Sequence, residues 1–423
     1  MNQKRIKSSE VATIILAGGE GTRLKPLTEI RCKPAVTFGG RYRIIDVAIS
    51  NAINAGFNDI YVLSQFLAAS LTGYLLDTYT TDALFGAHLE VLTPEQSSDH
   101  KKMWYEGTAD AVRKNLSKLL DHPANYFIIL SGDQLYSMDL SHMVEMAKKN
   151  DADLMIATIP VHESEAKRMG VMKVGNNLEI TDFFEKPKEV ETLLKFALSP
   201  EISLREGGLN NLTFLGSMGI YVFKREALIR LLQEDCRADF GKHLIPLQVK
   251  KGKSFAYVFD GYWEDIGTIA SYYQANICLT ENSHACLDLY NEIKPIYTQS
   301  ISLPAARLTN TTVLDSIICE GSVISAASIS QSMIGLKTFI DEDTIVQNSI
   351  LMGSPPRSTK PNIHIGKNCN LNKVIVDEGA YLEDNITLTN KKNMQFFDSK
   401  EIAISDGIII VKAGARIPKG FTL

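Results

Sequence analysis

Two hydrophobic patterns alternate along the first two thirds of the 423-residue chain. Fully apolar runs of strand length occur at residues 14–16, 60–63, 126–130 and 154–158. Segments with the helical period of 3.6 lie between them, as at residues 42–55 and 109–120. Strands that alternate with helices predict a Rossmann-like α/β domain, in which helices cover both faces of a mostly parallel sheet.

From Tyr290 onward the helical period ends, and small aliphatic residues recur every five or six positions before Gly, Ser, Asp or Asn. They are Ile318, Ile324, Ile329, Ile334, Ile340, Ile345, Ile350, Ile365, Leu371, Ile375, Leu382 and Leu388. This imperfect hexapeptide repeat predicts a left-handed parallel β-helix, interrupted by a protruding loop at residues 353–361. A series of antiparallel hairpins is the alternative, and the lack of Asn-Gly or Asp-Gly turns with alternating flanks disfavours it.

The two patterns divide the chain into an α/β domain (residues 1–280), a linker (281–300) and a β-helix domain (301–423). Two domains are also what this length favours. The net charge is −5 and no long basic run occurs, so neither nucleic acid nor an anionic membrane is an expected partner. No apolar run reaches the length of a membrane span, and residues 11–17 are expected to be a first strand, not a signal peptide.

Six cysteines are scattered without CxxC spacing. We expect them to be small buried hydrophobic residues in a reducing cytoplasm. Their positions are Cys32, Cys236, Cys278, Cys286, Cys319 and Cys369.

A glycine-rich loop follows the first apolar strand, and Arg23 and Lys33 come shortly after it. Glycines allow backbone N–H groups to approach phosphate, and a helix expected after the loop would direct its positive end there. The pattern predicts a nucleoside triphosphate site, with an ordinary strand-to-helix turn as the alternative. The Walker phosphate loop is excluded because Leu247 stands where its pattern needs the first glycine. The dinucleotide-binding fingerprint is excluded because Leu24 stands where it needs the third glycine.

Further motifs follow in order at residues 104–111, 131–136, 184–187, 217–223, 239–242 and 262–268. Together with the loop, Arg23 and Lys33, they resemble the sugar-1-phosphate nucleotidyltransferases, most closely the glucose-1-phosphate adenylyltransferase (ADP-glucose pyrophosphorylase) family. The resemblance covers nearly the whole chain. Residues 295–298 and 406–411 are closer to the cyanobacterial and plant branch than to the enteric one.

The resemblance implies that the chain transfers the adenylyl group of ATP to glucose 1-phosphate, forming ADP-glucose and pyrophosphate for glycogen or starch synthesis. It assigns catalytic roles to Arg23 and Lys33, and it places Mg²⁺ on Asp133 and Asp265. Two carboxylates close to phosphates also suit Mg²⁺ on chemical grounds. The attacking phosphate is already ionised, so alignment and charge neutralisation are expected to replace a general base.

The resemblance also implies two groups of binding residues. Residues expected around the sugar phosphate are Tyr105, Gly170, Glu185, Lys186 and Ser217, with Lys186 as a buried cation facing the phosphate. Residues expected around the nucleotide are Leu16, Ala17, Gly18, Gly19, Gly21, Thr22, Gln96, Gly107 and Thr108.

Two departures from the family pattern lie in these motifs. Gln134 stands where the family usually has histidine, and Glu95 stands in place of the first residue of a Gln-Gln pair near the base. Because of Glu95, a transferase that uses another nucleotide or another sugar phosphate remains the alternative. A regulatory subunit without activity is disfavoured because Arg23, Lys33, Asp133, Lys186 and Asp265 are all present. A β-helix that acetylates sugars would need a catalytic histidine, and His364 is the only one after His284.

The resemblance finally implies a homotetramer and an anionic allosteric effector. Family members carry effector-binding lysines at three positions where this chain has Ile30, Glu378 and Ala413. Lys412 and three arginines remain (Arg31, Arg43 and Arg416), so an anion site between the domains stays possible. Because Glu378 reverses the local charge, we expect weak activation by sugar phosphates or phosphoglycerate.

Overall fold

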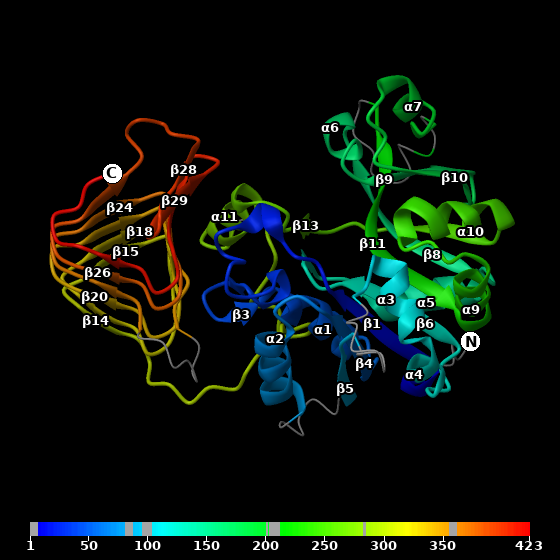
Figure 1. Ribbon diagram of the computed structural model, residues 1–423, viewed down its shortest axis with the longest axis horizontal. Coiled ribbons are helices and arrows are strands. Elements are labelled where there is room, and N and C mark those ends of the chain that lie inside the picture. Colours follow the sequence, from blue (N-terminus) through cyan, green and yellow to red (C-terminus); the bar gives the residue numbers. More distant parts are fainter. Residues whose placement is uncertain are drawn as a thin grey trace.

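The computed structural model describes residues 7–80, 88–94, 104–199, 202, 212–281, 285–354 and 362–423. It shows an α/β domain and a β-helix domain side by side (Figure 1). The last helix of the α/β domain is α11 (Ile269–Cys278), and the first β-helix strand is β14 (Arg307–Thr309). The residues between them contain no helix or strand in their described part.

One nine-stranded sheet forms the centre of the α/β domain, and its strands are β1 (Val11–Ala17), β4 (Asp59–Ser64), β5 (His88–Leu92), β6 (Tyr126–Ser131), β8 (Leu154–Val161), β9 (Gly170–Val174), β10 (Ile180–Glu185), β11 (Phe214–Lys224) and β12 (Ser254–Val258). All four predicted strands are present, as β1, β4, β6 and β8. Neighbours β5, β4, β1 and β6 run parallel, whereas β11 runs antiparallel to β6 and β8. The sheet is therefore mostly parallel around the glycine-rich loop.

Side chains of β1 alternate between two hydrophobic cores, one on each face of the sheet. Val11 and Ile15 belong to the core that includes α1 (Ile44–Asn54) and α5 (Leu140–Lys149). Ala12 and Ile14 belong to the other core. Helices that contribute to that second core are α3 (Thr108–Lys114), α4 (Leu116–Leu120), α9 (Arg225–Glu234) and α10 (Ile245–Lys251). Helices on both faces confirm the predicted layers.

Both helices predicted from periodicity are shorter than expected. Tyr42–Arg43 forms a short strand, β3, that pairs with β2 (Thr37–Phe38), and α1 begins only afterwards. The Arg43 backbone N–H donates to Asp46 Oδ2 at 2.8 Å and fixes that start. Residues 109–120 form α3 and α4 with a break at Asn115. Other short α-helices among the described residues are α2 (Ala68–Leu75), α6 (Glu163–Ala166) and α7 (Val190–Leu194).

The C-terminal domain is a parallel β-helix with three sheets. Its strands after β14 are β15 (Thr312–Leu314), β16 (Ile317–Ile318), β17 (Val323–Ser325), β18 (Ser328–Ser330), β19 (Met333–Ile334), β20 (Phe339–Ile340), β21 (Ile345–Gln347), β22 (Ile350–Leu351), β23 (His364–Ile365), β24 (Asn370–Asn372), β25 (Val374–Val376), β26 (Tyr381–Leu382), β27 (Thr387–Thr389), β28 (Phe396–Asp398), β29 (Ile402–Ser405), β30 (Ile408–Val411) and β31 (Arg416–Ile417). In one sheet Ile324, Ile340 and Ile365 stack in register, and all three are buried. The hexapeptide repeat is confirmed, and most of its residues fill the interior.

Two details of the predicted β-helix are wrong. Ile345 points outward and is 39% exposed, because Val346 occupies the interior position of that strand. One antiparallel hairpin also occurs, with Asp406 and Gly407 between β29 and β30. Both turn residues have positive φ, at 54° and 72°, as a two-residue hairpin turn requires. The predicted protruding loop lies mostly outside the described residues.

The cysteine prediction is only partly correct. Cys32, Cys319 and Cys369 are free and buried, but Cys236 is free and exposed. Cys278 and Cys286 form a disulfide that connects the end of α11 to the linker. The two cysteines are eight positions apart, so their pairing could not be recognised from CxxC spacing. No helix in the described ranges is both long enough and apolar enough to cross a membrane.

The two domains share an apolar interface and a buried cluster of charges. Met333, Ile350 and Ile375 of the β-helix belong to the same core as α11. Arg31 Nη1 lies 2.8 Å from Asp377 Oδ1, and Arg43 Nη1 lies 2.8 Å from Glu378 Oε1. We call these four charged residues the interdomain ion cluster. Breaking one partner of a buried pair leaves an uncompensated charge, so the cluster fixes how the domains are docked.

Candidate active site

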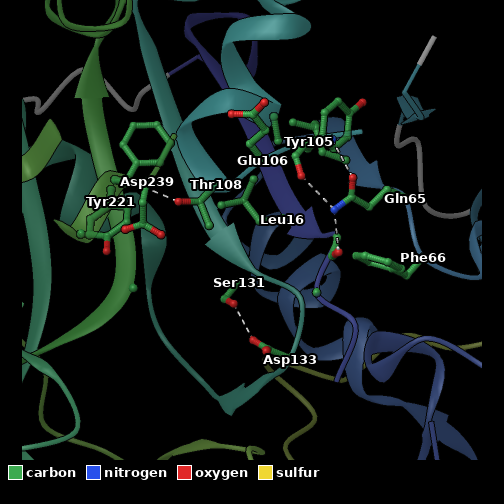
Figure 2. Close-up of a pocket in the computed structure, with 18 of the residues that line it drawn as sticks. Leu16, Gln65, Phe66, Tyr105, Glu106, Thr108, Ser131, Asp133, Tyr221 and Asp239 are labelled. Atoms are coloured by element: carbon green, nitrogen blue, oxygen red, sulfur yellow. Dashed lines mark hydrogen bonds between the residues drawn. The ribbon is translucent and has the colours of Figure 1, made fainter. Parts of the chain in front are cut away.

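The carboxyl ends of β1, β4 and β6 open onto a cavity of about 590 Å³ (Figure 2). Ligands bind at this edge in α/β sheets of this kind. Predicted site residues that line the cavity are Leu16, Gly18, Gly19, Tyr105, Gly107, Thr108, Asp133 and Glu185. Residues that line it without a predicted role include Gln65, Phe66, Ser131, Gly219, Tyr221 and Asp239.

Gln65 holds the glycine-rich loop against the segment that begins at Trp104. Its Nε2 donates to the carbonyl oxygens of Gly18 at 3.2 Å and Tyr105 at 3.3 Å, while Oε1 accepts from the Tyr105 N–H at 2.8 Å. Figure 2 shows these bonds beside Phe66, whose ring stacks on Trp104 at 5.3 Å. Gln65 was not predicted as a site residue. The sequence signal that could have identified it is its position as the first residue after β4.

The glycine-rich loop does not lead into the expected helix. Residues Thr22–Leu24 form a single 3₁₀ turn, so no long helix dipole points at the loop, and this part of the prediction was wrong. Gly21 has φ 68°, and a Cβ there would lie 3.0 Å from Lys33 Cβ, so glycine is needed on both counts. The loop therefore contributes close backbone approach and the Arg23 side chain. Ala17 is buried in the core, whereas Thr22 is exposed.

Lys33 joins the two predicted metal-binding carboxylates. Its Nζ lies 2.6 Å from Asp133 Oδ2 and 3.4 Å from Asp265 Oδ1. Asp133 lies between β6 and β7 (Gln134–Tyr136), and Asp265 ends β13 (Trp263–Asp265), which pairs antiparallel with β7. Residues that are 100 and 232 positions from Lys33 in sequence thus meet at its ammonium group.

The pKa values of Lys33, Asp133 and Asp265 shift because one cation lies between two anions. Burial opposes the charge of Lys33, but Asp133 and then Asp265 raise the pKa of its ammonium above the usual value. Burial also opposes ionisation of Asp133, yet Lys33 lowers the pKa of that carboxyl below its usual value. Burial and the charge of Asp133 raise the pKa of Asp265. The two carboxylates carry more negative charge than Lys33 alone neutralises, and a second cation would stabilise that excess.

The donor set suits Mg²⁺ that is shared with a substrate. Among the described residues, no group of three or more His, Cys, Asp or Glu side chains is placed to hold a metal ion. Mg²⁺ typically uses one or two carboxylates together with phosphate oxygens and water. Asp133 and Asp265 provide two carboxylates, and Ser131 Oγ donates to Asp133 Oδ1 and orients it. The residues present therefore fit a metal site that a phosphate completes.

Arg23 lies near this group without contacting the cavity wall. It is exposed, and a Cβ built at Gly267 would lie 3.4 Å from its Nη2. Gly267 follows Asp265 by two residues, so Arg23 and Asp265 belong to the same side of the site. A guanidinium in this position is available to phosphates that extend beyond the carboxylates.

Glu185 occupies the part of the cavity formed by β10 and the turn after Asp239. A Cβ at Gly170 would lie 2.8 Å from Glu185 Oε2, and one at Gly241 would lie 2.7 Å from the same oxygen. Both glycines make room for this carboxylate. Burial raises the pKa of Glu185, and the Lys186 ammonium opposes that rise.

Lys186 differs from the prediction of a buried cation. Its side chain is 59% exposed, and Nζ lies 3.4 Å from Glu185 Oε1. The backbone has φ 52°, a left-handed conformation that lysine rarely adopts. Ser217 in β11 accepts from the Gly219 N–H at 3.3 Å and so belongs to a local turn beside the cavity.

Gly107 and Thr108 lie at the start of α3 on another wall. A Cβ at Gly107 would lie 2.5 Å from the Ala238 carbonyl oxygen, so only glycine permits this close approach. Thr108 Oγ1 accepts from the Phe240 N–H at 3.0 Å. Gln96 and Glu95, the other expected base-reading residues, lie outside the described part of the chain.

His364 is engaged within the β-helix and lines no part of this cavity. Its Nε2 lies 2.9 Å from Asp341 Oδ2, and its ring packs edge-on against Tyr381 at 4.9 Å. These contacts give His364 a structural role on the outside of two neighbouring strands.

Two family models match the chain. Residues 12–282 match the model described as nucleotidyl transferase, and residues 302–422 match the GLGC left-handed parallel beta-helix domain. The first match covers the domain that contains the cavity, and the second covers the whole hexapeptide repeat. This succession of domains is the characteristic architecture of glucose-1-phosphate adenylyltransferases.

We predict that Asp133→Asn and Asp265→Asn each lower kcat by about 100-fold or more, because each removes a charge that a metal ion needs. The measurement is the steady-state rate at saturating Mg²⁺, with thermal unfolding to verify the fold. Asp260→Asn changes an exposed carboxylate in the same segment and serves as the control. Full turnover in either site variant would exclude the metal assignment.

Proposed function

The chain belongs to the nucleotidyl transferase family and carries a GLGC β-helix domain, and from this we propose that it transfers the adenylyl group of ATP to α-D-glucose 1-phosphate. The products are ADP-glucose and pyrophosphate, a supply of activated glucose for glycogen or starch-type glucan. The observation that carries the proposal is the convergence of Lys33, Asp133 and Asp265 beside the loop at Gly18 and Gly19.

In this proposal a phosphate oxygen of glucose 1-phosphate attacks the α-phosphorus of ATP, and pyrophosphate leaves in line. The bond from the α-phosphorus to the bridging oxygen breaks as the new phosphorus–oxygen bond forms. No proton needs to be removed, because the attacking phosphate is already ionised. The protein's part is to align two anions and to offset their repulsion.

Lys33 and Arg23 supply fixed positive charge to the triphosphate. Lys33 contributes a point charge close to Asp133, and Arg23 contributes a planar fork farther along the site. Asp133 and Asp265 would hold Mg²⁺, which supplies charge neutralisation at the phosphate oxygens when bound. Glu185 accepts hydrogen bonds from sugar hydroxyls, and Lys186 faces the sugar phosphate.

The exposed position of Lys186 is consistent with this role if the sugar phosphate covers it. Its partner Glu185 lines the cavity, so the ammonium stands at the edge of the same space.

We also infer a cytoplasmic homotetramer, as the family architecture suggests. The β-helix leaves apolar side chains exposed, among them Leu308, Val313, Leu314 and Phe396. Leu308, Val313 and Leu314 lie in the first two strands, so the first coil of the repeat exposes an apolar end that is open to association with another copy. Sedimentation of the full-length chain at micromolar concentration checks the assembly, and a monomer would contradict it.

Substrate profiling tests the proposed reaction. With glucose 1-phosphate, we expect kcat/KM for ATP to exceed that for UTP, CTP and GTP by at least about 100-fold, because a site built for one base leaves the others unpaired. The readout is pyrophosphate formed with each nucleotide. A preference for UTP or for another sugar phosphate would redirect the proposal within the family, and no turnover with any pair would favour a regulatory subunit.

Lys186→Ala should raise KM for glucose 1-phosphate roughly 10- to 100-fold, as expected for loss of one charge-assisted hydrogen bond, and change KM for ATP by about twofold or less. Lys188→Ala removes an exposed lysine two residues away and is the matched control. Equal changes in both KM values would show that Lys186 does not act on the sugar phosphate.

Effector response should be weak because the arginines expected to hold an anion already contact carboxylates. Arg43 and Thr37 both contact Glu378 Oε1, at 2.8 and 3.1 Å, and Arg31 contacts Asp377. Outside this cluster, Arg416 pairs with Glu383, and Lys412 pairs with Asp398. Carboxylates of the protein itself thus already pair with the arginines and the lysine that a phosphate-bearing effector would need.

We therefore predict less than about threefold activation by fructose 1,6-bisphosphate or 3-phosphoglycerate, since like charges repel at short range. Initial rates at subsaturating ATP, with each effector titrated into the millimolar range, provide the measurement. Glu378→Gln keeps the side-chain size and frees positive charge, so it should increase the response. Strong saturable activation of the unchanged protein would show that the remaining cations suffice.

A further inference from the structure

Gln134 lies in β7, the strand that pairs antiparallel with β13, next to the two carboxylates proposed to bind the metal ion. It follows Asp133 directly, and the antiparallel register places it opposite Asp265. Its side chain is buried, with 6% of the residue exposed. A polar side chain at this depth is stable only when its hydrogen-bonding groups are satisfied.

Both ends of the Gln134 amide have partners on separate segments. Nε2 donates to the Met218 carbonyl oxygen at 2.7 Å, and Oε1 accepts from Trp263 Nε1 at 3.3 Å. Met218 belongs to β11, 84 residues from Gln134, whereas Trp263 begins β13, the strand that ends at Asp265. The amide therefore links the β7–β13 strand pair to β11.

The β11 segment that Gln134 contacts is irregular and borders the cavity. The register of β11 with β8 shifts between Ser217 and Tyr221, which marks a bulge. Gly219 within it has φ 73°, and a Cβ there would lie 3.3 Å from Gln134 Nε2. Gly219 and Tyr221 both line the cavity, so the bulge forms part of its wall.

We propose that Gln134 is a positioning residue that holds the β7–β13 strand pair, with Asp133 and Asp265, and the Ser217–Tyr221 bulge in one fixed arrangement. This rests on the proposed function for its kinetic consequence, because the strand pair serves the triphosphate and the bulge borders the sugar phosphate. Gln134 touches neither substrate and acts only through its neighbours.

The amide is suited to this task because it donates and accepts at once and does not titrate. Methionine has similar size but can supply neither bond. Neutral histidine offers one donor and one acceptor, so it can replace the amide in part. These properties provide a disruptive variant and a conservative one at the same position.

The first test needs no substrate. Amide hydrogen exchange is measured on the intact chain for the peptides around residues 216–220 and 262–267. Gln134→Met should raise the exchange rate in both peptides by roughly tenfold, since each loses one buried hydrogen bond. Gln248→Met removes another buried amide, which donates to the Gly252 carbonyl, and should change neither peptide. An effect confined to one peptide, or absent from both, would overturn the proposal.

The second test is kinetic and uses a double-mutant cycle. Gln134→Met should lower kcat and raise KM for glucose 1-phosphate by roughly tenfold each, with KM for ATP changed by about twofold or less. Trp263→Phe removes the indole donor, and its effect should not add to that of Gln134→Met because both variants break the same bond. Additive effects would contradict the link.

Gln134→His should recover most of the activity lost in Gln134→Met, and a failure to recover any would argue for a packing role alone. The two tests also separate the proposal from the reaction assigned to the protein. If the unchanged protein forms no ADP-glucose, the proposed function fails, and the exchange measurement still decides whether Gln134 links the two segments.

Discussion

The contact of one lysine with two carboxylates organises this molecule. Lys33 lies between Asp133 and Asp265, and without a cation there the two carboxylates would repel each other in a partly desolvated site. Three distant segments meet at this point, and each comes from a different strand end or turn. The cavity, the glycine-rich loop and the β7–β13 strand pair are all arranged around this charge balance. A nucleotide with its metal ion changes that balance, which is why the arrangement suits phosphate chemistry.

The position of Lys33 depends in turn on the β-helix domain. Arg31 precedes it by two residues and is buried against Asp377 of the β-helix, while Arg43 is held by Glu378. The interdomain ion cluster therefore fixes the segment that carries Lys33. This explains how a domain of which no described residue lines the cavity can still determine the geometry of the site. The charges of Asp377 and Glu378, although they lie in the β-helix domain, therefore help to maintain the geometry of the catalytic domain.

Local patterns were sufficient to predict the fold and part of the site. The apolar run before Gly18 became β1, and the aliphatic repeat became the β-helix, because burial periodicity is recorded in the sequence itself. Ile345 and the missing helix after Gly21 show the limit, since a shift of one residue or a tight turn leaves composition almost unchanged. Pairs that depend on distant segments could not be inferred, such as Gln65 with Tyr105 or Arg43 with Glu378. The roles of Lys33 and Asp265 were inferred from the family resemblance. That the two side chains contact each other became evident only in the structure.

The central claim is that the protein supplies an incomplete metal site that the nucleotide completes. Binding of Mn²⁺, followed by electron paramagnetic resonance with and without a non-hydrolysable ATP analogue, tests it most directly. With two carboxylates already paired to Lys33, we predict weak Mn²⁺ binding to the free protein and at least about tenfold tighter binding once the analogue is present. Tight stoichiometric binding to the free protein, or no gain with the nucleotide, would contradict the account.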